Sequence, residues 1–185
     1  MRLSVVLILL CFTSISNANP SAECASFIHY RAVNKGATPE YWVSESVVRG
    51  IHLAHVVQDV EIVDWKFWCP IVASLAETES TYNYAARNGS CKGMFQFSPG
   101  TAKELLKEKI GAESVSKNSV VHSSVLAVLF VMKYTNKYSG NVRRVMKRYT
   151  ASDKNANKVV TVLAAMRKDY SQFVNEEHDV LCVVP

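Results

Sequence analysis

The sequence predicts a mainly α-helical fold with one small β-hairpin or irregular patch beside a cleft. Apolar residues recur at helical spacing along most of the chain, as in the stripe formed by Val121, Val125 and Val128. Proline, glycine and capping residues mark the starts and stops of these periodic segments. The helical pattern is interrupted over residues 82–97, where the Asn88-Gly89 dipeptide has the signature of a tight turn. The interruption is the expected β element.

The expected helices follow from their boundary signals. Thr38-Pro39, Pro70 and Ser98-Pro99 are start signals, because proline is favoured in the first turn of a helix. Gly140 is a stop signal after a long apolar segment. In chain order, the expected helices are 39–58, Ile71–Ser80, Gly100–Lys109, Val120–Tyr138, Asn141–Thr150 and Asn155–Asn175.

The first 18 residues have the pattern of a secretory signal peptide. Arg2 supplies the basic start, Val5–Phe12 the apolar run and Ser16-Asn17-Ala18 the small-residue cleavage site. The apolar run is shorter than the roughly 20 residues of a membrane span, and no later segment is a better candidate. We therefore expect an exported protein, periplasmic or extracellular, with a single domain over residues 19–185.

Charge and composition point to no cofactor. The formal net charge is +5, which suits contact with anionic cell-wall polymer but also suits many other proteins. The basic residues Arg143-Arg144 and Lys147-Arg148 are explained by a solvated helix face, and no nucleic-acid motif accompanies them. His52 and His55 have the spacing of metal ligands on one helix face, but no third ligand is evident. We expect no nucleic-acid partner, metal or cofactor, and a monomer.

Four cysteines follow the signal segment: Cys24, Cys69, Cys91 and Cys182. An even number in an exported chain favours disulfides over free thiols. Three pairings are possible, and the sequence alone does not choose among them. We favour Cys69–Cys91, because one begins the helix before the cleft and the other lies in the loop that folds back over it. Cys24–Cys182 would then join the two chain ends.

Two acidic residues compete for a catalytic role at the end of the Ile71–Ser80 helix. Helical steps back from Glu79 meet only apolar residues, whereas the same steps from Glu77 meet a less hydrophobic face. Glu79 is therefore expected to continue the buried stripe, and Glu77 to face outward. Desolvation raises the pKa of a carboxyl group, as a general acid acting on a glycosidic oxygen requires. The alternative for Glu79 is a structural salt bridge with Arg87 or Lys92.

One segment carries the most specific signal. Glu79-Ser80 is followed by Tyr82-Asn83, by Gly93-Met94-Phe95-Gln96 and by Ser98-Pro99-Gly100-Thr101-Ala102. This order resembles the soluble lytic transglycosylases, the peptidoglycan-cleaving relatives of goose-type lysozyme. The resemblance implies a lysozyme-like fold, with its core motifs at about residues 71–151.

The resemblance also implies roles for individual residues. Glu79 is the implied catalytic acid, and Gln96 is implied to hydrogen-bond the substrate in the cleft. Met94 and Phe95 are implied to pack beside the sugar, with plain core packing as an equal alternative for each. Ser80 either touches substrate or caps locally.

A third motif of the family is matched less completely. Tyr149 corresponds to a tyrosine whose hydroxyl, in the family, lies near the catalytic acid and the substrate. The residues after it depart from the family pattern, with Thr150 in place of Asn and Ser152 in place of Gly. These departures affect the expected substrate contacts of the last loop more than the chemistry.

The implied activity is cleavage of the β-1,4 bond between N-acetylmuramic acid and N-acetylglucosamine in peptidoglycan glycan strands. Glu79 acts as acid and then as base, and the muramyl C6 hydroxyl closes a 1,6-anhydro ring, so that no second carboxylate is needed. One alternative is a hydrolytic lysozyme with Asp153 as partner acid, and another is an inactive module that binds the wall. Family members serve wall turnover or secretion, conjugation and phage machines, and the sequence indicates none of these in particular.

Overall fold

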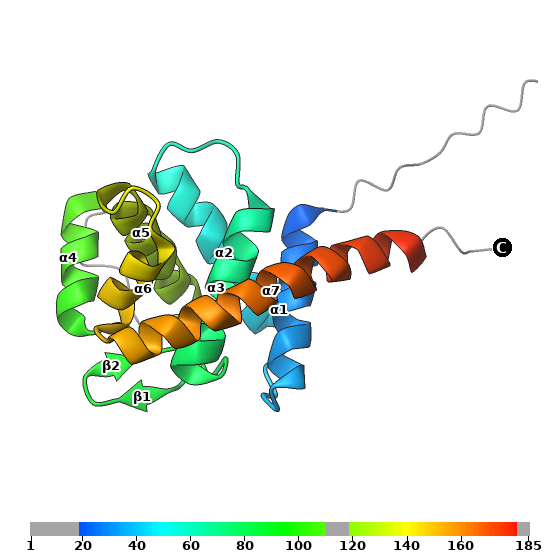
Figure 1. Ribbon diagram of the computed structural model, residues 1–185, viewed down its shortest axis with the longest axis horizontal. Coiled ribbons are helices and arrows are strands. Elements are labelled where there is room, and N and C mark those ends of the chain that lie inside the picture. Colours follow the sequence, from blue (N-terminus) through cyan, green and yellow to red (C-terminus); the bar gives the residue numbers. More distant parts are fainter. Residues whose placement is uncertain (1–18, 110–118, 181–185) are drawn as a thin grey trace, which may run out of the picture.

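The computed structural model describes residues 19–109 and 119–180, so the expected signal peptide and Cys182 lie outside the described residues. It confirms a mainly α-helical fold with a small antiparallel hairpin, in which Arg87 pairs with Lys92 and Asn88 with Cys91 (Figure 1). In chain order, the elements are α1 (Pro20–Asn34), α2 (Tyr41–Val57), α3 (Trp65–Ser80), β1 (Arg87–Asn88), β2 (Cys91–Lys92), α4 (Pro99–Lys109), α5 (Val120–Lys137), α6 (Val142–Thr150) and α7 (Asp153–Val180).

Helix α3 lies at the centre of the molecule and ends at the candidate site. It contacts α1, α2, α5 and α7, and every residue from Trp68 to Ala76 is buried. The sequence pattern placed its start at Pro70, but α3 begins five residues earlier. The reason is Asp64, whose side chain accepts a hydrogen bond from the backbone N–H of Phe67 at 3.1 Å and caps the helix. Pro70 therefore lies inside α3, where it has no N–H to donate.

Helix α1 is the element that the sequence pattern missed. Its start carries ordinary signals, because Asn19 accepts a hydrogen bond from the Ser21 N–H and Pro20 occupies the first helical position. Helix α1 packs against α2, α3 and α7, and the Phe27 ring meets the Tyr170 ring edge-on at 5.0 Å. One face of α3 is thus covered by a helix that the sequence analysis did not include.

The disulfide corrects the predicted cysteine pairing. Cys24 of α1 is bonded to Cys69 of α3, with a Cα–Cα distance of 5.7 Å, so the preferred Cys69–Cys91 and Cys24–Cys182 pairs are both wrong. Cys69 lies ten positions before Glu79, roughly 15 Å along the helix at 1.5 Å per residue. Cys91 is on β2, beside the Glu79 end, and it is unpaired among the residues that the structure describes. The roughly 15 Å between Cys69 and the end of α3 where Cys91 lies is too long for a disulfide, whose Cα atoms lie within about 7 Å.

Two further observations concern the expected absence of a membrane span and of a metal site. Within residues 19–109 and 119–180, no helix combines the length and the apolar character that a bilayer crossing requires. Across the same ranges, no three His, Cys, Asp or Glu side chains gather as a metal site would need. His55 is buried, with its Nδ1 2.8 Å from the Ile51 carbonyl oxygen, and His52 is exposed.

Candidate active site

A cavity of about 390 Å³ lies at the C-terminal end of α3. We call it the catalytic cavity. It brings together Glu79, Gln96 and Tyr149, three of the six residues to which the resemblance assigned roles. The lining residues are Glu79, Asn88, Cys91, Gln96, Phe97, Ser98, Thr101, Glu104, Leu105, Phe130, Tyr134, Arg148, Tyr149, Thr150, Ala151 and Asn155.

Glu79 has the electrostatics of a general acid. Its carboxyl group is partly buried at the end of the apolar face of α3, and this burial raises the pKa of Glu79 above the ordinary value. The Lys158 ammonium on α7 opposes the rise. Within the described parts of the chain, Glu79 makes no salt bridge, and the alternative pairing with Arg87 or Lys92 is not found. A carboxyl group in this state can hold a proton and release it into the cavity.

Tyr149 forms a fixed wall of the same cavity. Its hydroxyl donates a hydrogen bond to the Phe95 carbonyl oxygen at 2.9 Å. Its ring meets the rings of Phe97 and Phe130 edge-on, at 5.3 and 5.0 Å between centroids. Burial raises the pKa of Tyr149 well above its usual range, and the nearby Glu79 carboxylate raises it further. Tyr149 is therefore neutral and close to the acid.

Gln96 links the two ends of the hairpin by hydrogen bonds and lines the catalytic cavity. Its Nε2 donates hydrogen bonds to the carbonyl oxygens of Ala86, at 3.1 Å, and Gly93, at 2.6 Å. Its backbone has a φ of 50°, in the left-handed region that a non-glycine residue rarely adopts. The Oε1 atom is buried and has no hydrogen-bond partner among the described residues. Gln96 thus braces the loop with its nitrogen and leaves its oxygen as an acceptor.

The other three residues with implied roles lie outside the catalytic cavity. Met94 and Phe95 are buried in the core, which favours the core-packing alternative for both residues. Ser80 follows Glu79 on the next face of the helix, where its hydroxyl donates to the Ala76 carbonyl oxygen at 3.3 Å. It lines a different cavity.

Glu77 does not face outward as the helical pattern predicted. Its side chain is only 9% exposed, accepts a hydrogen bond from Arg31 at 3.2 Å and forms an ion pair with Lys35 at 2.9 Å. The Tyr82 hydroxyl donates to the same carboxylate at 3.5 Å. The error has a definite cause, since Arg31 lies on α1 and Lys35 caps its end. Glu77 thus forms structural ion pairs, whereas Glu79 forms none with a residue that the structure describes.

The departures in the third motif have local structural roles. The Thr150 hydroxyl donates to the Met146 carbonyl oxygen at 3.0 Å, and Thr150 also lines the catalytic cavity. The Ser152 hydroxyl accepts a hydrogen bond from the Asn155 N–H at 3.1 Å, as in a cap at the start of α7. Between them, Ala151 has a φ of 57° and ends α6. The turn between α6 and α7 is thus made without glycine.

Asp153, the partner acid of the hydrolytic alternative, is engaged elsewhere. It is exposed and pairs with Arg143 at 3.1 Å and with Lys147 at 2.7 Å. The hydrogen bond from Lys147 lowers the pKa of Asp153. Asp153 is also not among the residues that line the catalytic cavity.

Sequence reasoning missed a second carboxylate on the cavity wall. Glu104 of α4 accepts hydrogen bonds from Lys133 at 3.0 Å and from the Tyr134 hydroxyl at 3.4 Å. The hydrogen bond from the Lys133 ammonium lowers the pKa of Glu104, whereas burial raises the pKa of Glu79. Arg148 donates to the same Tyr134 hydroxyl at 3.2 Å. No motif marks Glu104, because its place depends on how α4 packs on α5.

The helical body with one short antiparallel hairpin is consistent with a mainly α-helical, lysozyme-like fold. The family model described as "Transglycosylase SLT domain" matches residues 61–171, which is more than half of the chain. The chain belongs to this family, whose members are lytic transglycosylases that act on peptidoglycan. The comparison with curated proteins and the comparison with solved structures each returned no significant match.

Proposed function

We propose that this protein cleaves the bond between N-acetylmuramic acid and N-acetylglucosamine in peptidoglycan, with Glu79 as the only catalytic carboxyl group. One observation carries the proposal. Glu79 has a raised pKa, makes no ion pair with a described residue, and shares a cavity with Tyr149 and Gln96. The region matched by the transglycosylase family includes all three residues.

The proposed reaction has two proton transfers at one carboxyl group. Protonated Glu79 first gives its proton to the glycosidic oxygen, and the bond from this oxygen to muramyl C1 breaks. The resulting carboxylate then takes the proton of the muramyl C6 hydroxyl while O6 bonds to C1, which closes the 1,6-anhydro ring. The attacking hydroxyl belongs to the sugar itself, so high effective molarity replaces a positioned water. Glu79 ends the reaction protonated, as it began.

The mass of the released fragments tests this proposal. We expect purified protein acting on peptidoglycan to release muropeptides with anhydro-muramyl ends, each one water lighter than a reducing end. Mass spectrometry of the released fragments is the measurement. Reducing ends throughout would overturn the transglycosylase reaction, and no release from folded protein would favour a wall-binding module.

The second carboxylate supports hydrolysis as the other candidate reaction. Glu104 lines the catalytic cavity as an anion, and a glycosidase that uses water or a covalent intermediate needs an anionic partner for its acid. In that case, Glu104→Gln abolishes activity as Glu79→Gln does. If the muramyl C6 hydroxyl attacks instead, the Glu104→Gln variant still releases the anhydro product. The same product analysis therefore separates the two reactions.

We also propose that the protein works outside the cytoplasm as one domain over residues 19–185, after cleavage behind Ala18. Peptidoglycan, the substrate of the family, lies there. Intact-mass measurement of exported protein checks the cleavage, and retention of residues 1–18 would contradict it.

The raised pKa of Glu79 predicts how cleavage depends on pH. Only the protonated acid can start the reaction, so kcat/KM is expected to fall as pH rises through the pKa of Glu79. Lys158 stabilises the carboxylate, so Lys158→Gln should raise this pKa and shift the falling limb to higher pH. Lys154→Gln, at another exposed lysine on α7, is the matched control and should leave the profile in place. An unshifted limb in Lys158→Gln would contradict the assignment of this limb to Glu79.

A further inference from the structure

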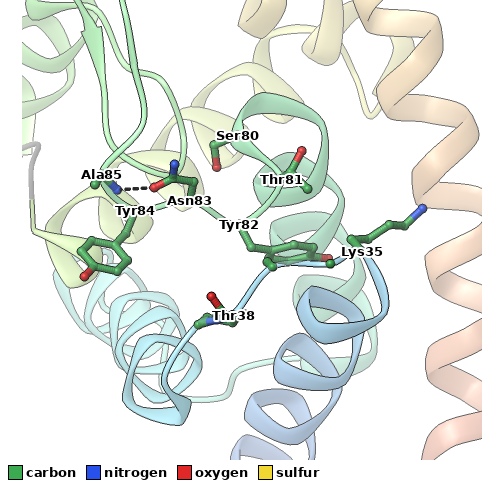
Figure 2. Close-up of a pocket in the computed structure, with 11 residues that line it drawn as sticks. Lys35, Thr38, Ser80, Thr81, Tyr82, Asn83, Tyr84 and Ala85 are labelled. Carbon is green, nitrogen blue, oxygen red and sulfur yellow. Dashed lines mark hydrogen bonds between the residues drawn. The ribbon is translucent and has the colours of Figure 1, made fainter.

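A second cavity, of about 530 Å³, adjoins the end of α3, and we call it the distal cavity. One wall is the turn between α1 and α2, over Lys35–Pro39, and the other is the segment Ser80–Ala85 (Figure 2). Glu79 lines the catalytic cavity and Ser80 lines the distal cavity, although the two residues are consecutive. The last turn of α3 therefore separates two hollows that are neighbours on the protein.

The distal cavity offers hydroxyl and amide groups beside an exposed aromatic ring. Figure 2 shows Tyr84 and Thr38 beside one space, with Asn83 and then Ser80 above it. The Tyr84 side chain is 43% exposed, and its ring meets that of the equally exposed Trp42 at 5.6 Å between centroids. An aromatic ring with a polar tip, next to neutral hydrogen-bonding groups, is suited to a ligand that has both apolar and hydroxylated faces. A sugar ring is such a ligand.

The distal cavity lacks a free charge on its described wall. Lys35 is the one charged residue among those that line it, and its ammonium pairs with Glu77 at 2.9 Å. Figure 2 shows the ammonium end of Lys35 pointing away from Tyr84 and Thr38. A carboxylate-bearing ligand, such as the stem peptide of peptidoglycan, would therefore find no uncompensated cation here. The wall is matched to a neutral saccharide.

The wall of the distal cavity is held in an unusual backbone conformation. Thr81 and Tyr82 have φ values of 52° and 61°, two successive non-glycine residues in the left-handed region. Such conformations cost energy, persist where the surroundings enforce them, and cluster at ligand sites. Here, the buried Tyr82 ring and a hydrogen bond from the Ala85 N–H to Asn83 Oδ1, at 2.9 Å, hold the segment. The cavity is preformed.

We propose that the distal cavity binds sugar units of the same peptidoglycan strand that is cut in the catalytic cavity, so that a long strand occupies both. This inference rests on the proposed function. The turn over Lys35–Pro39 precedes the matched residues 61–171, so half of the distal wall is supplied by a part of this chain outside the family region. Affinity for a strand that fills both cavities exceeds affinity for a fragment that fills one.

Calorimetric titration of the full chain carrying Glu79→Gln, which binds without cutting, tests the proposal. The ligands are a peptide-free disaccharide and a long peptide-free glycan strand, both with their muramyl lactyl carboxyl groups converted to amides so that neither carries a charge. We expect Tyr84→Ala to weaken binding of the long strand by roughly three- to tenfold, as an aromatic contact is typically worth, and to leave the disaccharide unchanged. Thr38→Trp, which fills the cavity from an exposed position, should act in the same way. Tyr30→Ala is the matched control, since Tyr30 is 50% exposed and lines neither cavity.

Three results would overturn the distal site. They are equal losses for the disaccharide and the long strand, unchanged binding of the long strand in both variants, and binding only of strands that carry stem peptides. Wild-type release of muropeptides is measured in parallel. If the wild type cleaves and the variants bind normally, the distal site alone is refuted. If the wild type neither binds nor cleaves glycan, the proposed function falls as well.

Discussion

Replacing Glu79 by Gln is expected to reduce muropeptide release by about 10⁴-fold or more. One general acid or base typically contributes about 10²–10⁴-fold, and Glu79 is assigned both transfers. Gln keeps the size of the side chain but neither gives nor takes a proton. The variant should fold normally, because Glu79 makes no salt bridge with a described residue. Initial rates on purified peptidoglycan are the measurement.

The control for Glu79→Gln must be a glutamate that lies outside the catalytic cavity and holds no structural ion pair. Glu77→Gln would have been the natural choice for an outward-facing acid, but Glu77 holds Arg31 and Lys35, and its loss would weaken the fold. Glu45 on α2 is an exposed glutamate outside the catalytic cavity, so Glu45→Gln should keep the rate within a few-fold. Retention of near-normal activity in Glu79→Gln would refute the assignment of the acid.

Replacing Cys24 and Cys69 together by Ala is expected to lower the free energy of unfolding by about 4 kcal/mol. The disulfide spans a sequence separation of 45 residues, and the entropy of closing such a loop in the unfolded chain gives this figure. The loss is a large part of the roughly 5–15 kcal/mol that stabilises a typical domain. Urea unfolding of the wild type and the double variant under oxidising conditions measures it.

Cys91→Ala is the matched control for the disulfide. Cys91 is partly buried and unpaired among the described residues, so its replacement should leave most of the stability in place. A loss comparable to that of the double variant would mean that Cys91 takes part in a stabilising disulfide, which contradicts its assignment as an unpaired thiol. Addition of reductant should destabilise the wild type and have little effect on the double variant.

Local signals in the sequence predicted most of the helices. The apolar stripe and Gly140 gave the long helix α5 to within one residue, and Asn88-Gly89 located the hairpin. Where local signals conflicted, the prediction failed. Pro70 suggested a helix start, but Asp64 caps the helix earlier, and a proline inside a helix is tolerated when the residues around it are buried.

The candidate site was predictable only in the parts that depend on a single helix face or a motif. Glu79 follows from the apolar stripe of α3, and Tyr149 and Gln96 follow from the resemblance. Glu104 does not, since its place on the cavity wall depends on how α4 packs on the next helix, α5. The misplacement of Glu77 and the wrong cysteine pairing share one cause, which is the omission of α1.

Helix α1 also changes where the functional unit of this protein begins. The matched region starts at residue 61, yet α1 is bonded to α3 through Cys24 and neutralises Glu77 through Arg31. A fragment limited to residues 61–171 would expose the face of α3 that α1 covers and leave a nearly buried carboxylate without its counterions. The region that defines the family is therefore smaller than the unit that we expect to fold, and α1 belongs to that unit because it is bonded to the helix that carries Glu79.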